Sequence, residues 1–390
     1  MGPNDVIEIR IPHTLFGVGA INGLGELVNR LSSSRALIVT DPGLVKAGIV
    51  ATVQAALGSA GLEAEVFDRS GPEAPVSAIE ELSRKVKDDG HDLLIGVGGG
   101  SVMDTTKAAS LLAANPSLTV QDLIEGKPAA RSVAKILIPT TAGTGSEWSS
   151  TAVVTTDTTD DRTYPYRSSE NYPKAAIIDP GLTQDLAAKT TAETGVDALS
   201  HAIEAYTSCR ANLLSDGYAS TAISLISTSL RPAYAKGSLR MEDRYRLSIA
   251  AAMAMAAGSL AGVGLAHFMN HALGKKAHIP HGAAVGLMLP YVMEYNLISD
   301  PAKFAEVARL LGEKTGRLST LDAALKSVAA IRRLLSDLGM PQRLSEVGLT
   351  EADIPHLVDE LITYQAFPIA LMNPREVGPE EAAEIYLKAL

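Results

Sequence analysis

Residues 93–112 read LLIGVGGGSVMDTTKAASLL, and this stretch decides the fold. Its first part, Leu93–Val97, has the length and apolar composition of a buried strand, and a run of glycines follows it directly. A helical sequence then continues through Leu112. A buried strand that turns through glycines into a helix is typical of parallel α/β sheets, where ligands bind beyond the carboxyl ends of the strands.

The same order of strand and helix occurs on both sides of this stretch. The apolar run Ala36–Val39 ends at Asp41 before a helical sequence, and Lys135–Ile138 is a third such run. At the N-terminus, residues 7–11 alternate isoleucine with charged residues, which predicts a half-buried strand. The repeated order predicts a parallel sheet with helices on both faces.

The strand patterns stop after about residue 187. Apolar residues at helical spacing then predict helices at 191–207, 213–229, 242 onward, 301–311 and 318–338. We therefore expect an N-terminal α/β domain, residues 1–187, and an all-helical C-terminal domain, residues 188–390. The polar stretch 157–173 between them predicts a solvated hairpin or loop.

Composition excludes several classes of partner. The 390 residues carry a formal net charge of −10 without a Lys/Arg block, which excludes nucleic acid and an anionic membrane as expected partners. One cysteine, Cys209, excludes an internal disulfide, and no secretory leader pattern is recognised, so we predict a cytoplasmic protein. The uncharged stretch 249–266 is rich in Ala, Gly and Met, which favours a closely packed buried helix over a membrane span.

The glycine-rich turn suits a phosphate. Backbone amides at Gly98, Gly99, Gly100 and Ser101 can approach a ligand closely, and the following helix directs its N-terminal N–H groups at it. The pattern is not the G-x-G-x-x-G fingerprint, and a tight strand-to-helix turn also uses glycine. Asp104 and Lys107 follow at helical spacing, and a surface ion pair is the plainest interpretation of them.

Two further strand ends carry polar groups. One loop contains Thr140, Thr141, Thr144 and Ser146, and it either hydrogen-bonds a phosphate or ribose or only turns the chain. Asp41 follows another strand, where a carboxylate accepts hydrogen bonds from ribose hydroxyls and repels the extra phosphate of NADP. This favours NAD, although capping of the next helix is a common role for such an aspartate.

The helical half contains the metal-ligand pattern. Asp197 and His201 are four residues apart, as are His267 and His271, so each pair lies on one helix face. His281 follows in an apolar neighbourhood. One carboxylate with three imidazoles binds a divalent transition ion and leaves room for a substrate oxygen, although the ligand type does not distinguish Fe(II) from Zn(II), Co(II) or Ni(II).

These motifs, in this order, resemble those of the iron-containing (group III) alcohol dehydrogenase family, and the resemblance covers essentially the whole chain. The matching segments are FGVG (16–19), GGGSVMDTTK (98–107), PTTAGTGSE (139–147), GVDALSHAIEAY (195–206), GLAH (264–267), PHG (280–282) and NPR (373–375).

The resemblance implies roles for individual residues. It places metal ligands at Asp197, His201, His267 and His281, with Fe(II) as the expected ion and Zn(II) or another divalent ion as the alternative. It places Asp41, the turn Gly98–Ser101, Asp104, Thr140 and Thr141 in the dinucleotide site, and His271 beside the nicotinamide. We take His271 and Asp104 as the candidate catalytic residues.

The resemblance also implies an activity. We expect a metal-dependent, NAD(H)-linked alcohol dehydrogenase or aldehyde reductase, homodimeric, with its active site in a cleft between the two domains. The ion would act as a Lewis acid on the substrate oxygen while hydride moves between the carbinol carbon and nicotinamide C4. His271 would pass the proton to solvent, a role that suits an imidazole titrating near neutrality.

Three other functions fit parts of the sequence. A reductase like maleylacetate reductase has the same fold without the metal site, but the complete set of candidate ligands argues against it. A metal hydrolase would leave the loops at the strand ends without a role. A catalytically silent NAD or metal sensor would need no complete ligand set.

Some residues depart from the family pattern. Thr163 stands where relatives usually carry a lysine, and Arg162 is a candidate substitute for that cofactor contact. Trp148 replaces a smaller residue, with no indication of the direction it faces. The cluster Tyr164, Tyr166 and Arg167 is also unusual, and its aromatic and cationic groups suggest an anionic substrate.

Overall fold

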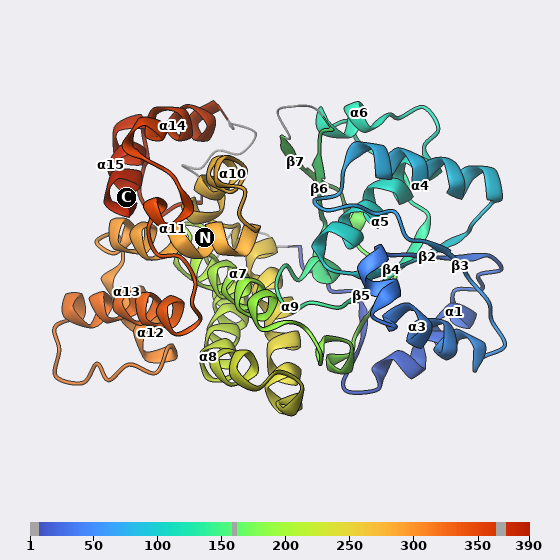
Figure 1. Ribbon diagram of the computed structural model, residues 1–390, viewed down its shortest axis with the longest axis horizontal. Helices are drawn as coiled ribbons and strands as arrows, with labels where there is room; N and C mark the ends of the chain where they lie inside the picture. Colours follow the sequence, from blue (N-terminus) through green and yellow to red (C-terminus); the bar gives the residue numbers. More distant parts are fainter. Residues whose placement is uncertain (1–7, 158–161, 364–371) are drawn as a thin grey trace. The chain divides into compact units, whose positions relative to one another are not determined.

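The computed structural model describes residues 8–157, 162–363 and 372–390. The chain divides into two compact units, of which one is Arg10–Asp185 and the other includes Leu186–Leu390. The first unit is coloured blue to green and the second green to red (Figure 1).

The first unit is built on a six-stranded sheet with the order β1-β8-β5-β4-β2-β3, in which every neighbouring pair is parallel. Its strands are β1 (His13–Phe16), β2 (Ala36–Val39), β3 (Glu65–Phe67), β4 (Leu93–Gly98), β5 (Ala134–Pro139) and β8 (Ala175–Ile178). Its helices are α1 (Leu24–Arg30), α2 (Pro42–Lys46), α3 (Ile49–Gly58), α4 (Val76–Asp89), α5 (Gly100–Ala114) and α6 (Val120–Ile124).

Both faces of this sheet are buried. Along β4, Leu93, Ile95 and Val97 belong to the core cluster shared with α1 and α3, whereas Leu94 belongs to the cluster shared with α4 and α5. Figure 1 shows these two pairs of helices on opposite sides of the strands. Because both sets of alternating side chains meet apolar neighbours, the strand sequence is a continuous apolar run.

The N-terminal strand prediction is wrong. Ile9 and Ile11 lie in no strand and are 53% and 38% exposed, and residue 7 lies outside the described residues. β1 begins only at His13, where Ala175 of β8 supplies a pairing partner. Alternation in the sequence is not sufficient to form a strand. An edge strand extends only as far as its neighbour offers backbone groups for pairing.

The polar stretch after β5 contains an antiparallel pair. β6 (Thr151–Thr155) pairs with β7 (Thr163–Arg167), with Thr151 opposite Arg167 and Thr155 opposite Thr163. A hairpin is therefore present among the described residues, but it is not fully solvated, since Tyr166 and Asn171 are buried. Residues 158–161 lie outside the described residues.

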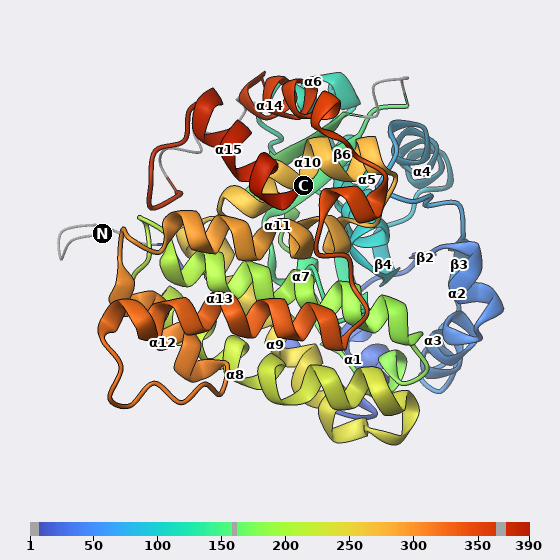
Figure 2. The same ribbon diagram turned by 60° about the vertical axis from the view of Figure 1, so that its left-hand side comes forward.

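The second unit contains helices and no strand among the residues that the structure describes. The helices are α7 (Ala188–Thr207), α8 (Leu213–Lys236), α9 (Met241–Ala261), α10 (Leu265–Ala277), α11 (His281–Asn296), α12 (Pro301–Leu310), α13 (Thr320–Asp337), α14 (Ile354–Thr363) and α15 (Pro379–Ala389). α11 packs against both α7 and α13, and Figure 2 shows it running alongside them. The five predicted helices are all present.

No single helix in the described part of the chain is long and apolar enough to cross a membrane. Only α9 and α10 taken together meet that test of length and composition, and they are bent by 110° at the break between them. The Ala/Gly/Met-rich stretch lies largely in α9, where most of the alanines are buried.

Candidate functional site

Three helices of the second unit bring the predicted metal ligands together. α7 carries Asp197 and His201 one turn apart, α10 carries His267 in its first turn, and α11 begins at His281. α7, α10 and α11 contact one another pairwise. Residues separated by up to 84 positions, 281 minus 197, thus meet at one place.

Asp197, His267 and His281 form the closest group. Asp197 Oδ1 lies 3.5 Å from His267 Nε2 and 3.4 Å from His281 Nε2, and the ligand atoms of the three residues lie within 4.8 Å of one another. His201 lies beside this group, with Nδ1 3.9 Å from Asp197 Oδ2 and its ring centroid 4.2 Å from that of His267. The structure therefore assembles three of the four predicted ligands directly and places the fourth next to them.

A glycine allows His281 to reach this position. A Cβ on Gly282 would lie 2.1 Å from the backbone oxygen of Glu193 in α7, which no real side chain tolerates. The first turn of α11 therefore packs directly on the backbone of α7 one turn before Asp197. This contact explains why the histidine at the start of α11 is followed by glycine.

Glu204 belongs to the site, although the sequence analysis missed it. Its carboxylate accepts hydrogen bonds from His267 Nδ1 at 2.5 Å, Gly264 N at 2.9 Å and Ala266 N at 2.6 Å. The bond to Nδ1 leaves Nε2 of His267 facing Asp197, as in a carboxylate–histidine–metal arrangement. The sequence signal that points to Glu204 is its spacing, because it follows His201 by three residues and so lies on the same helix face.

The electrostatics of the group are dominated by burial and mutual contact. Burial would raise the pKa of Asp197, but the neighbouring imidazoles of His201, His267 and His281 hold it well below its usual range. Burial lowers the pKa of His201 to about 3. Burial would also lower the pKa of His267, but the carboxylates of Glu204 and Asp197 outweigh it and raise the value to about 9.

The buried polar atoms of this group fit a cation. Asp197 Oδ1, His201 Nδ1 and His267 Nε2 are buried and have no hydrogen-bond partner among the described residues. Leaving a buried polar atom unsatisfied costs about 1–3 kcal/mol, and a positive ion contacting all three would remove that penalty. One carboxylate and neutral imidazoles are also the ligands that divalent transition ions prefer.

His271 lies on α10 one turn after His267. Its ring centroid is 6.4 Å from that of His281. Burial lowers the pKa of His271 to about 3, so the imidazole is neutral throughout the physiological range instead of titrating near neutrality. Asn270, the preceding residue, lies with its amide nitrogen 2.7 Å from His281 Nδ1, a contact that sequence reasoning also missed.

In the first unit, the two predicted loops pack against each other. Thr140 N donates to Gly98 O at 3.1 Å, and a Cβ on Gly100 would lie 2.8 Å from Thr144 Cγ2. The glycines therefore serve the contact between the loops as well as any approach of a phosphate. Asp41 lies after β2, next to β4 in the sheet, and its Oδ1 caps α2 by accepting from Leu44 N at 3.0 Å.

Asp104 and Lys107 do not form the surface ion pair considered above. Lys107 is fully buried, its Nζ donates to Ser146 Oγ at 2.6 Å, and Ser146 Oγ donates to Asp104 Oδ1 at 2.7 Å. Val153 N donates to the other oxygen of Asp104 at 3.0 Å. The carboxylate predicted to be catalytic thus holds α5, the Thr140–Ser146 loop and β6 together.

Burial governs the charges in this network. It raises the pKa of Asp104 and lowers that of Lys107, while each group partly offsets the other. The neighbouring Glu147 is also buried, its Oε2 has no hydrogen-bond partner among the described residues, and burial raises its pKa to about 7.

Two of the unusual residues have structural contacts. Trp148 Nε1 donates to Thr14 Oγ1 of β1 at 3.0 Å. The Tyr166 hydroxyl donates to Lys127 O at 2.9 Å and accepts from Ala129 N at 3.0 Å, with the side chain buried. Arg167, at the end of β7, is exposed.

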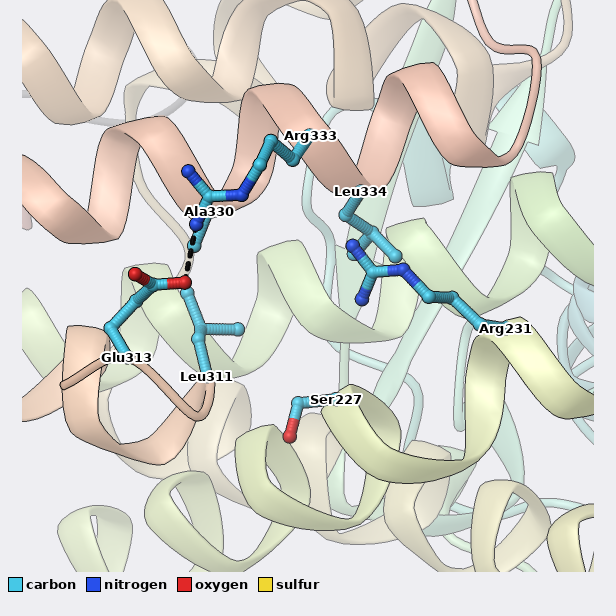
Figure 3. A pocket seen from close by; sticks show the side chains of 7 residues that line it. All are labelled: Ser227, Arg231, Leu311, Glu313, Ala330, Arg333 and Leu334. Atoms are coloured by element: carbon cyan, nitrogen blue, oxygen red, sulfur yellow. Dashed lines mark hydrogen bonds and ion pairs between the residues drawn. The ribbon is translucent and has the colours of Figure 1, made fainter.

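A separate small pocket in the second unit contains none of the predicted site residues. It lies between α8 and the segment from Leu311 to α13, and its two arginines, Arg231 and Arg333, come from different helices (Figure 3). Arg333 already pairs with Glu313, and Arg231 pairs with Asp337 at 2.7 Å. Its cationic groups are therefore committed to neighbouring carboxylates.

Comparison with known families decides the assignment. Residues 12–180 match the family model described as iron-containing alcohol dehydrogenase, and residues 191–390 match the C-terminal model of the Fe-containing alcohol dehydrogenase family. The chain belongs to the iron-containing alcohol dehydrogenase family. Its fold is that of a member of that family.

Individual relatives span almost the whole chain. This iron-containing alcohol dehydrogenase is 37% identical to 1,3-propanediol dehydrogenase of Klebsiella pneumoniae over 381 residues, 96% of both chains. It is 35% identical to NAD-dependent methanol dehydrogenase of Bacillus methanolicus, covering 97% of this chain and 98% of the relative. The crystal structure of a 1,3-propanediol oxidoreductase superposes with a TM-score of 0.94 at 36% identity, covering 99% of this chain and 100% of that one.

These findings confirm the predicted family, the fold class of a parallel α/β unit with a helical unit, and the activity of an NAD-linked alcohol or aldehyde oxidoreductase.

Proposed function

We propose that this oxidoreductase interconverts small alcohols and aldehydes with a divalent ion held by Asp197, His201, His267 and His281. The observation that supports the ligand set is the buried Asp197 Oδ1, which faces two imidazole nitrogens at 3.4–3.5 Å without a hydrogen-bond partner among the described residues. When bound, the ion supplies Lewis-acid polarisation of the substrate oxygen.

The protein's own groups prepare that chemistry. Glu204 contacts His267 Nδ1, so Nε2 is the nitrogen that would release its proton and offer a lone pair to an ion. Gly282 holds the first turn of α11 against α7 and thereby places His281 beside Asp197. Both contacts are made between groups of the protein itself, and such internal support lowers the cost of assembling a site.

The dinucleotide is assigned to the loops at the carboxyl ends of β2, β4 and β5. Gly98, Gly99, Gly100 and Ser101 present backbone groups at the start of α5, which suits a pyrophosphate. Thr140, Thr141 and Thr144 lie against that turn. Asp41 supports NAD over NADP by its charge. Asp104 and Ser146, which are hydrogen-bonded to each other, position α5 and the Thr140–Ser146 loop.

His271 is assigned to proton transfer in its neutral form. A neutral imidazole accepts a proton at one nitrogen and releases one from the other, so it can relay a proton without storing charge. The ring centroid of His271 lies 6.4 Å from that of His281. This separation supports a position beside the metal ligands instead of among them.

Small neutral diols and alcohols are the first candidate substrates, since the relatives are named for 1,3-propanediol and methanol. An anionic aldehyde stays a second candidate because Arg167 is exposed. Fe(II) is the ion we expect from the family, and a cytoplasmic homodimer is the state we expect.

Metal analysis of anaerobically purified protein tests this function. We expect about one divalent ion per chain, NADH oxidation with an aldehyde, and loss of both in Asp197→Ala while NADH still binds. Metal-free protein that still reduced maleylacetate would instead assign the chain to the metal-independent branch. The same assay with Arg167→Ala measures the preference between anionic and neutral aldehydes.

A further inference from the structure

A second cluster of potential ligands lies in the first unit, at the amino ends of the strands. The dinucleotide loops lie at the carboxyl ends. Glu65 is the first residue of β3, Asp89 is the last of α4, and His91 lies just before β4. Because the strands are parallel, their amino ends all lie on the same side, whereas Asp41, Gly98 and Thr140 lie at the carboxyl ends. The ligand atoms of Glu65, Asp89 and His91 lie within 4.8 Å of one another.

His91 is the unusual member of this cluster. Its side chain is completely buried, and Nδ1 lies 3.4 Å from the carbonyl oxygen of Arg35. A carbonyl only accepts, so Nδ1 carries the hydrogen and Nε2 carries the lone pair. Nε2 has no hydrogen-bond partner among the described residues. A buried acceptor is thus left unsatisfied, and burial lowers the pKa of His91, which keeps the ring neutral.

The unsatisfied nitrogen faces two carboxylates. Nε2 lies 4.0 Å from Glu65 Oε2 and 3.9 Å from Asp89 Oδ2. Two carboxylate oxygens cannot donate to it in their ionised form. A group that satisfied all three atoms at once would be a cation, either an ammonium with three N–H donors or a metal ion.

Lys85 marks where such a cation would lie. Its Nζ is 2.8 Å from Glu65 Oε2 and 2.7 Å from Asp89 Oδ2, the same two oxygens that His91 faces. The side chain of Lys85 is 25% exposed, and its four-carbon stem can carry the ammonium into water. Glu65 also pairs with Arg35 at 3.4 Å through its other oxygen, Oε1, so Oε2 and Asp89 Oδ2 are the oxygens that a divalent ion in place of the Lys85 ammonium would contact.

We propose that Glu65 Oε2, Asp89 Oδ2 and His91 Nε2 form a second divalent metal site, in which Lys85 competes with the ion. One imidazole and two carboxylates favour ions such as Zn(II), Co(II) or Ni(II) over Ca²⁺ and Mg²⁺. Neighbouring ligands of tetrahedral zinc are about 3.3 Å apart, so the partly exposed carboxylates need to close only slightly around the ion. The Arg35 carbonyl fixes the histidine tautomer, as such partners do in established sites.

Zn(II) binding to the full-length protein tests the proposal. The protein is first saturated with one divalent ion per chain and desalted, and further Zn(II) uptake is then measured by calorimetry and by equilibrium dialysis. We expect a second equivalent, together with a thermal unfolding midpoint that rises with Zn(II) concentration, since the site joins β3, α4 and the segment before β4.

Variants separate this site from adventitious binding. Glu65→Gln, Asp89→Asn and His91→Gln should each abolish the second equivalent, whereas Lys85→Met should tighten it by about tenfold because a competing charge is removed. Lys87→Met and Asp88→Asn, which change exposed charges on the same helix, should leave it unaltered.

The proposal is overturned if no Zn(II) binds beyond the first equivalent, or if the second equivalent survives in Glu65→Gln and Asp89→Asn. It is also overturned if Lys85→Met binds the second Zn(II) no more tightly than Lys87→Met. Glu65 and Asp89 are partly exposed, so these variants decide the matter even if His91→Gln does not fold.

Discussion

Glu204 accepts a hydrogen bond of 2.5 Å from His267 Nδ1, and the same carboxylate accepts from the backbone N–H groups of Gly264 and Ala266. This one side chain therefore fixes both the start of α10 and the orientation of a candidate metal ligand. A residue outside the predicted ligand set thus connects α7 to the ligand on α10.

Glu204→Gln tests that connection. The amide keeps the size of the side chain but removes the charge, so His267 is held less firmly and loses basicity. We expect metal affinity to fall by about 10–100-fold, the usual loss for such outer partners. Competition with a chelator measures it. An unchanged affinity in folded Glu204→Gln protein would show that Glu204 supports only the backbone.

Gly282→Ala tests the close packing of α11 on α7. The added methyl group would meet the Glu193 backbone oxygen at 2.1 Å, so the helix must shift away from Asp197. We expect a loss of about 1–3 kcal/mol of stability and a weakened metal site. Gly217→Ala in α8 is the matched control, because a Cβ there meets nothing within 4 Å. Equal unfolding midpoints for the two variants would contradict the packing argument.

Asp104→Asn distinguishes a positioning role from a catalytic one. The change leaves the buried Lys107 without its carboxylate, and breaking a buried pair costs about 3–5 kcal/mol. We expect a lower thermal midpoint and weaker NADH binding, with kcat at saturating NADH within about threefold of the original. A large fall in kcat with unchanged NADH binding would restore the predicted catalytic role.

Asp41→Ser tests the choice of cofactor. Serine can still cap α2 through Leu44 N, so the helix start is preserved while the negative charge is removed. We expect the ratio of NADPH to NADH efficiency to rise by about tenfold, because repulsion of the extra phosphate disappears. Asp41→Ala, which loses both cap and charge, separates the two effects. A constant ratio in both variants would rule out Asp41 as the discriminating residue.

Glu147→Gln tests the buried carboxyl beside Lys107. The folded-state pKa is raised from 4.5 to about 7, so the folded protein holds a proton that the unfolded chain releases between these values. Stability from this group is present below pH 4.5 and is lost as pH rises through 7. The slope is at most about 1.4 kcal/mol per pH unit. Chemical denaturation from pH 5 to 8 should show a weaker decline for Glu147→Gln, and parallel curves would contradict the assignment.

Much of the first unit was predictable because its signals are local. An apolar run beside glycines identifies β4 and the start of α5 from neighbouring residues alone. The N-terminal strand failed because a strand also needs a pairing partner, and β8 offers one to His13 but not to Ile9. The surface pair expected for Asp104 and Lys107 failed because exposure depends on β6 and the Thr140–Ser146 loop, which cover that part of α5.

The sequence alone determined the order of strands and helices, the loops at the strand ends, and the four-residue spacing of Asp197 with His201, since each follows from periodicity along one element. Tertiary structure alone decided that Glu204 orients His267, 63 residues away, and that His91 faces Glu65. The physical reason is that hydrogen bonds and burial depend on contacts between distant segments, and such contacts leave no period in the sequence.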